Sequence, residues 1–86
     1  MTGVIYEDKL GMLWIATYMG KLNCYDKVKD TWTEFISDIK NPSSISGRWI
    51  NQIYEDKKGR LWFATNSGLN RYNRYTKSFV NFTEKN

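Results

Sequence analysis

The sequence predicts an all-β chain that folds into two four-stranded antiparallel sheets, one after the other along the chain. Short runs of β-branched, aromatic and other apolar residues alternate with Gly-marked turns about every 8 to 12 residues, a pattern typical of successive short strands. No segment carries the apolar stripe of an amphipathic helix. The residues IYEDK at positions 5–9 recur at positions 53–57, which indicates two copies of one structural unit.

The two copies account for nearly all of the 86 residues. They share 15 identical residues over 30 aligned positions, at an offset of 48 that falls to 47 after Gly20, where the first copy holds the extra residue Lys21. We expect strands over residues 4–7, 13–17, 22–25 and 32–36 in the first copy and over 49–55, 61–65, 69–73 and 79–83 in the second. Residues 1–38 and 49–86 are assigned to the two units, and residues 39–48 to a connector.

Turn signals recur together with the strands. After the first strand of each unit an Asp opens a turn, and a Gly follows three residues later, where the turn requires a positive φ. A second Gly turn follows the second strand, beside a Thr whose hydroxyl suits a turn hydrogen bond better than a nucleophile's role. The recurring positions are Asp8, Gly11, Trp14, Thr17 and Gly20 in the first copy and Asp56, Gly59, Trp62, Thr65 and Gly68 in the second.

The second strand of each unit defines the architecture. Its residues are apolar at consecutive positions, LWIA at 13–16 and LWFA at 61–64, so both faces of the strand require a covering layer. A four-stranded sheet of about 45 residues that is covered on both faces by copies of itself is a β-propeller blade. We therefore expect Trp14 and Trp62 in the core between blades rather than as stacking platforms for a sugar ring.

The composition excludes several classes of enzyme. The chain has no His and one Cys, so it cannot assemble a Ser-His-Asp or Cys-His nucleophile system or an ordinary zinc site. The pairs Glu7-Asp8 and Glu55-Asp56 could supply an acid and a base or bind a cation, but their recurrence at the same turn favours turn capping. Cys24 is expected to be a small buried apolar residue. We expect no catalytic residue, no metal and no cofactor.

The net charge of +4 comes from the second half of the chain. There the segment 71–77 (RYNRYTK) could grip phosphates and stack bases, but a solvated outer turn explains it better, so nucleic acid is not an expected partner. No run of about 18 apolar residues is present and the first residues lack the pattern of a signal peptide, so we expect no membrane contact by this segment. Arg48, Trp49 and Asn51, at the end of the connector and near a blade rim, are the candidate ligand-binding residues.

One segment has a recognisable family pattern. Residues 53–73, IYEDKKGRLWFATNSGLNRYN, closely resemble the two-component regulator propeller repeat, I-x-E-D-x-x-G-x-L-W-[IF]-[GA]-T-x-x-G-L-x-x-[YF]-[DN]. Residues 41–46 are similar to that family's inter-blade connector, and the resemblance extends over about residues 4–83, with a departure at Met19 and Lys21 around Gly20. It implies the periplasmic sensor region of a hybrid histidine kinase of the inner membrane, in systems that sense glycans and therefore with an oligosaccharide ligand.

We therefore predict a non-catalytic, two-blade part of the ligand-sensing propeller of a sensor histidine kinase. The alternative is a stand-alone module that builds a propeller by self-association and binds a protein or nucleic acid. In both cases two outer blade faces, each on the order of 300 Å², remain to be covered by further blades or by copies of the chain. Since closed propellers commonly have about 4 to 8 blades, about two to four copies would complete one.

Overall fold

The computed structural model describes residues 3–17 and 21–82. Within these residues the strands are β1 Val4–Glu7, β2 Met12–Ala16, β3 Lys21–Asp26, β4 Thr31–Ile36, β5 Ile50–Glu55, β6 Leu61–Thr65, β7 Gly68–Asn73 and β8 Ser78–Phe82. The first sheet contains β1 to β4 and the second β5 to β8, each antiparallel and in sequence order. The predicted fold class is confirmed, and each strand begins and ends within one residue of its expected bounds.

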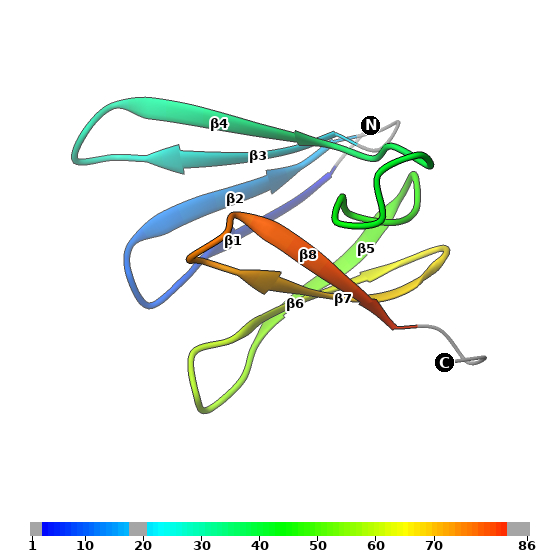
Figure 1. Ribbon diagram of the computed structural model, residues 1–86. Helices are drawn as coiled ribbons and strands as arrows, with labels where there is room; N and C mark the ends of the chain where they lie inside the picture. The colour runs from blue at the N-terminus through cyan, green and yellow to red at the C-terminus, as the bar shows by residue number, and fades with distance from the viewer. Residues whose placement is uncertain (1–2, 18–20, 83–86) are drawn as a thin grey trace.

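The two sheets stack on one another like adjacent propeller blades. Figure 1 shows the first sheet above the second, with the connector between β4 and β5 at one end of the stack. The first strands of the two sheets, β1 and β5, lie side by side, as the innermost strands of neighbouring blades do. In the part of the chain described above, no helix is long and apolar enough to cross a membrane.

The β1–β2 and β5–β6 turns have the same geometry. The Gly11 N–H donates to the Asp8 carbonyl oxygen at 2.9 Å, and the Gly59 N–H donates to the Asp56 carbonyl oxygen at 3.0 Å. Gly11 and Gly59 have φ of 82° and 80°, and beyond their chain neighbours no atom lies within 4 Å of a Cβ built there. The left-handed backbone, not crowding, therefore requires glycine at these positions.

The β6–β7 turn is held by a threonine. The Thr65 hydroxyl donates to the Gly68 carbonyl oxygen at 3.2 Å and accepts the Ser67 N–H at 3.1 Å, and Gly68 has a φ of 131°. The equivalent Thr17 is exposed just after β2, and Gly20 lies outside the described residues. Thr65 is therefore a turn-stabilising group with its hydroxyl fully engaged.

The core lies between the two sheets, and we call this interface the joint. Trp14 on β2 is its largest fully buried side chain. The Trp14 ring centroid lies 5.3 Å from that of Phe63 and 4.8 Å from that of Tyr72, both edge-to-face across the joint. The buried apolar residues are Trp14, Ala16, Leu22, Cys24, Ile45, Ile53, Leu61, Phe63 and Phe79.

The connector, residues 37–49, is fastened to the second sheet by buried hydrogen bonds. The Asn70 side chain accepts the Ser46 N–H at 3.0 Å and donates to the Ser46 carbonyl oxygen at 3.3 Å. The Phe79 N–H donates to the Ser43 carbonyl oxygen at 2.8 Å, and Ile45 is buried. The connector therefore covers the edge of β8 and holds one end of the second sheet.

Each sheet has one face in the joint and one outer face. Trp14 lies in the core between the two sheets, whereas Trp62 is half-buried and points away from the first sheet, because residues alternate along β6 and its neighbours Leu61 and Phe63 fill the joint. The expected place of Trp62 between two blades stays a prediction. The outer face of the first sheet comprises Ile5, Glu7, Leu13, Ile15, Lys21, Asn23, Tyr25, Trp32, Glu34 and Ile36. The outer face of the second sheet comprises Gln52, Tyr54, Trp62, Ala64, Leu69, Arg71, Val80 and Phe82.

Candidate functional site

In the first sheet a buried carboxylate ties the β1–β2 turn to the core tryptophan. Asp8 Oδ1 accepts the N–H groups of Leu10 and Met12, both at 2.9 Å, and Asp8 Oδ2 accepts the indole N–H of Trp14 at 2.9 Å. The Asp8 side chain has no exposed surface. Since both oxygens are occupied by donors of the turn and the core, this carboxylate is not placed to act on a substrate.

The second sheet repeats this arrangement with Asp56. Its Oδ1 accepts the N–H groups of Lys58 and Arg60 at 3.0 and 2.9 Å, and its Oδ2 accepts the indole N–H of Trp62 at 2.9 Å. Arg60 Nε also donates to Oδ2 at 2.7 Å. These donors, the Trp62 indole first, hold the pKa of the Asp56 carboxyl well below its usual range.

An ion cluster crosses the joint. Arg74 of the second sheet places Nη1 3.1 Å from Asp8 Oδ2 and Nη2 3.6 Å from Glu55 Oε2. The Glu55 side chain is 2% exposed, and Glu55 also accepts the Tyr6 hydroxyl at 3.2 Å. Burial, reinforced by this hydrogen bond to a carboxylate, raises the pKa of the Tyr6 hydroxyl. The cluster therefore joins β1 and the β1–β2 turn of the first sheet to β5 and the β7–β8 turn of the second.

The acidic pairs do not converge on one point. Glu7 lies 2.7 Å from the Lys27 ammonium on the surface, whereas its neighbour Asp8 bonds to Trp14 in the core. Within residues 3–17 and 21–82, no three or more His, Cys, Asp or Glu side chains gather as metal ligands do. The one cysteine, Cys24, is buried in the joint, and burial raises the pKa of its thiol to about 11.

A polar cleft of about 690 Å³ lies between the connector and the β6–β7 turn. Its polar lining is supplied mainly by Asp38, Asn41, Ser44, Ser46, Arg48, Asn66 and Asn81. The backbone N–H groups of Arg48 and Trp49 donate to Asn66 Oδ1 at 2.9 and 3.1 Å, so this amide positions the end of the connector. We call this feature the connector cleft.

The structure places the three candidate ligand-binding residues in different environments. Arg48 lines the connector cleft. Trp49 does not line it, although it is the next residue and its side chain is 47% exposed. Asn51 is exposed where the β5–β6 register shifts, between Ile50 and Gln52, so it is the extra residue of a β-bulge.

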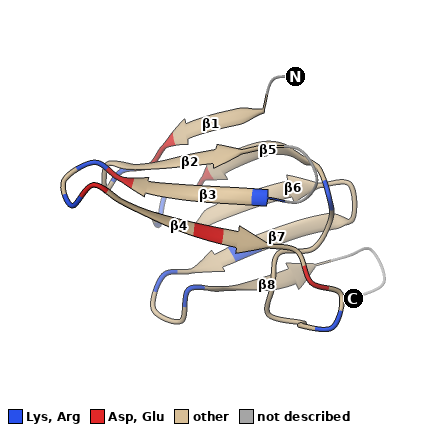
Figure 2. Cartoon of the chain, turned by 90° about the horizontal axis from the view of Figure 1, so that it is seen from above, with Lys and Arg blue, Asp and Glu red and all other residues tan. Residues whose placement is uncertain are grey.

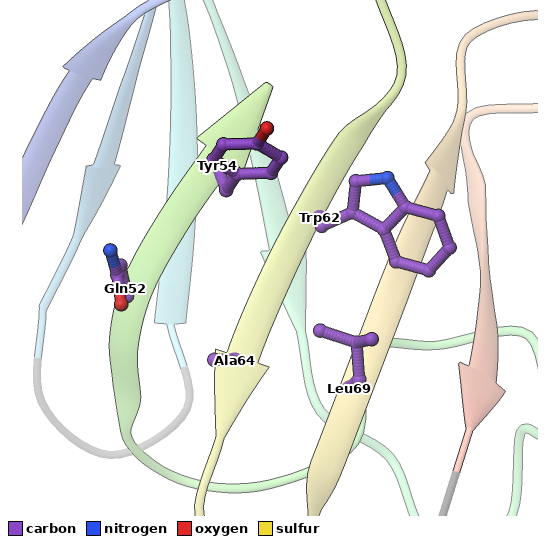
Figure 3. Close-up of a pocket in the computed structure, with 5 residues that line it drawn as sticks. All are labelled: Gln52, Tyr54, Trp62, Ala64 and Leu69. Carbon is purple, nitrogen blue, oxygen red and sulfur yellow. The ribbon is translucent and has the colours of Figure 1, made fainter. Parts of the chain in front are cut away.

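A second depression, the aromatic hollow, lies on the outer face of the second sheet. It has a volume of about 360 Å³ and is lined by Gln52, Tyr54, Trp62, Ala64 and Leu69. Figure 3 shows these side chains on the same side of β5, β6 and β7, with the Trp62 indole next to Leu69. The Arg71 guanidinium lies 5.5 Å from the ring centroids of both Trp62 and Phe82, so a cation borders the hollow.

The basic segment 71–77 does not form a single surface. Arg71 lies on the outer face of the second sheet, Tyr72 packs against Trp14 in the joint, and Arg74 belongs to the buried ion cluster. Tyr75 is 98% exposed in the β7–β8 turn. The two arginines therefore lie on opposite faces of the sheet instead of along one track for a phosphate backbone.

Sequence reasoning missed the bonds between aspartate and tryptophan. Asp8 and Trp14 are six residues apart, as are Asp56 and Trp62, and this repeated spacing was the available signal. It also missed Arg74, whose partner Asp8 is 66 residues away and leaves no local pattern.

Comparison with known proteins identifies one repeat. Residues 44–67 match the family model described as two component regulator propeller. The match runs from the connector through β5 and β6 to the β6–β7 turn, so it includes both Asp56 and Trp62 and much of the connector cleft. A search of curated proteins finds no match to the chain. The chain therefore carries a β-propeller repeat of the two-component regulator type, which is a non-catalytic kind of domain.

Proposed function

We propose that the chain forms two adjacent blades of the ligand-sensing propeller of a two-component sensor histidine kinase, on the periplasmic side of the inner membrane, with an oligosaccharide as ligand. The observation that carries the proposal is the match of residues 44–67 to the two-component regulator propeller. These residues also form one wall of the connector cleft, so the family segment and the candidate ligand site coincide.

The connector cleft has the chemistry that an oligosaccharide requires. Sugar hydroxyls need both donors and acceptors, and the lining offers the Arg48 guanidinium, the Asp38 carboxylate and several amides and hydroxyls. Its volume of about 690 Å³ lies within the usual range of about 300 to 1,000 Å³ for small-ligand sites.

Binding to the cleft is tested by calorimetry of the purified chain against a panel of plant and host oligosaccharides. We expect Arg48→Ala to weaken binding by about tenfold, because it removes a hydrogen-bonding group of the cleft lining. Tyr75→Ala is the control, since Tyr75 is almost fully exposed in the β7–β8 turn, away from the cleft lining. Equal affinity of all variants, or no binding across the panel, would contradict the ligand site.

The signalling part of the proposal is tested at the gene. We expect the reading frame that encodes this segment to continue into a histidine kinase. A frame that encodes these two blades without a kinase would contradict the sensor role, whatever the binding result.

A further inference from the structure

The outer face of the second sheet is equivalent, through the repeat, to the face that the first sheet presents to the joint. The offsets of 48 and 47 pair Tyr54 with Tyr6, Trp62 with Trp14, and Phe82 with Phe35. Tyr6, Trp14 and Phe35 pack in the joint, whereas Tyr54, Trp62 and Phe82 border solvent.

The outer face of the first sheet is likewise equivalent to the face that the second sheet presents to the joint. Ile15 and Tyr25 stand where the second sheet has Phe63 and Tyr72, the two rings that pack edge-on against Trp14. The outer face of the second sheet therefore corresponds to the first sheet's side of the joint, and the outer face of the first sheet corresponds to the second sheet's side.

We infer that the outer face of the second sheet binds the outer face of the first sheet of a second copy of this chain, head to tail, in the geometry of the joint. The inference depends only on the two faces, so it holds whether or not the connector cleft binds an oligosaccharide; within a longer propeller chain, the next blades of that chain would occupy the same faces in the same geometry. It fills the aromatic hollow: Trp62 packs against Ile15 and Tyr25 of the second copy, as Trp14 packs against Phe63 and Tyr72.

The polar contacts of the joint also have equivalents on the outer faces. In the joint, Glu55 accepts the Tyr6 hydroxyl and pairs with Arg74. On the outer face of the first sheet, Glu7 already pairs with Lys27 at 2.7 Å, and Glu7 and Lys27 are the repeat equivalents of Glu55 and Arg74. The Tyr54 hydroxyl of one copy would therefore donate to Glu7 of the next.

A paired change of charge points to a second copy of this chain as the occupant. In the joint, Lys77 of the second sheet lies with Glu34 and Phe35 of β4 along one cavity, next to the β3–β4 pair of the neutral Cys24 and Thr33. Arg71 replaces Cys24 on the outer face of the second sheet, and Asp30 replaces Lys77 in the hairpin of the first. Asp30 and Lys77 share the same turn position, with φ of 53° and 55°. In the contact between copies, Arg71 of one copy would therefore lie against Asp30 of the next.

Figure 2 shows the charged residues near this contact: an acidic residue lies on β4, both basic and acidic residues lie in the β3–β4 hairpin, and a basic residue lies on β7.

The test is sedimentation equilibrium of the whole chain over a hundredfold range of concentration. We expect the mean mass to rise well above 10.2 kDa with concentration. Arg71→Glu alone places a carboxylate against Asp30, and Asp30→Arg alone places a second guanidinium against Arg71, so each variant should associate about tenfold more weakly. Urea unfolding of each variant establishes that it remains folded.

Mixing the two variants is the decisive experiment. The glutamate introduced in one variant is complementary to the arginine introduced in the other, and the remaining contact is the native pair of Arg71 and Asp30. The equimolar mixture should therefore recover association, with the two variants in alternating order. A 10.2 kDa monomer at every concentration, unchanged association of the single variants, or no recovery on mixing would overturn the inference. So would an oligosaccharide that binds the monomer and shields Trp62 from a fluorescence quencher, because that result would assign the hollow to a ligand.

Discussion

Replacing Asp8 by Ala tests how far the joint depends on one buried carboxylate. The change removes the acceptor of three N–H groups, including the indole N–H of Trp14, which is 1% exposed and has no access to water. It also leaves Arg74 without the nearer of its two carboxylates. A buried donor without a partner costs about 1–3 kcal/mol, and a buried ion pair that loses one member costs about 3–5 kcal/mol. These contributions overlap in one side chain, so we expect the free energy of unfolding to fall by about 3–5 kcal/mol.

Asp56→Ala is the matched control, because Asp56 makes the same three hydrogen bonds at a partly exposed site. There the released N–H groups reach water, and we expect a loss of about 1–2 kcal/mol. Both variants are measured by urea titration with tryptophan fluorescence, at low concentration so that the outer faces stay free. Should Asp8→Ala fail to fold, Asp8→Asn retains one acceptor oxygen and gives the comparison. Equal losses for Asp8 and Asp56 variants would refute the role assigned to the joint.

Further tests address the turns, the titrating groups and metal binding. Gly59→Val should lower stability by about 1–3 kcal/mol because of its positive φ, whereas Lys58→Ala should change it by less than about 0.5 kcal/mol, both in urea. The pKa of Asp56 is lower in the folded chain than in the unfolded chain, so its contribution to stability is complete above the unfolded pKa of about 4 and is lost as the pH falls below that value. The urea midpoint should therefore drop below about pH 4, and it should drop less in Asp56→Asn. With a pKa raised to about 11 by burial, Cys24 should resist a thiol reagent at pH 8 until urea is added, and rapid labelling of the folded chain would contradict its place in the joint. A chelator should leave the thermal midpoint unchanged, whereas a shift of several degrees would indicate a bound metal.

The strands could be predicted from the sequence because each is bounded by a local signal. Alternating side chains and Gly turns act over a few residues, and the β1–β2 and β5–β6 turns use the same Asp and Gly in both copies. The repeat also predicted that both sheets would have the same order of four strands, as they do.

The position of Trp62 could not be predicted in the same way. Trp14 and Trp62 have similar sequence contexts, GMLWIAT and GRLWFAT, and the order of the sheets decides which of them the other sheet covers. The surroundings of the candidate ligand-binding residues could not be predicted either. Arg48 lines a cleft because the connector folds back onto Asn66, and Asn51 lies at a β-bulge that no local residue pattern predicts. Long-range contacts of this kind depend on the assembled fold.

The pairing of every strand with its neighbour in sequence has a consequence for how the chain reaches its structure. Each sheet can form by successive closure of short hairpins, a rapid process, whereas the Arg74–Asp8 contact closes a separation of 66 residues. We therefore expect the joint to form last, so that substitutions within it accelerate unfolding more than they slow folding. Before the joint forms, the second sheet of one molecule can pack on the first sheet of another molecule instead of on the first sheet of its own chain. Refolding at high concentration would then yield exchanged dimers, and slow refolding in dilute solution would favour closure within a single chain.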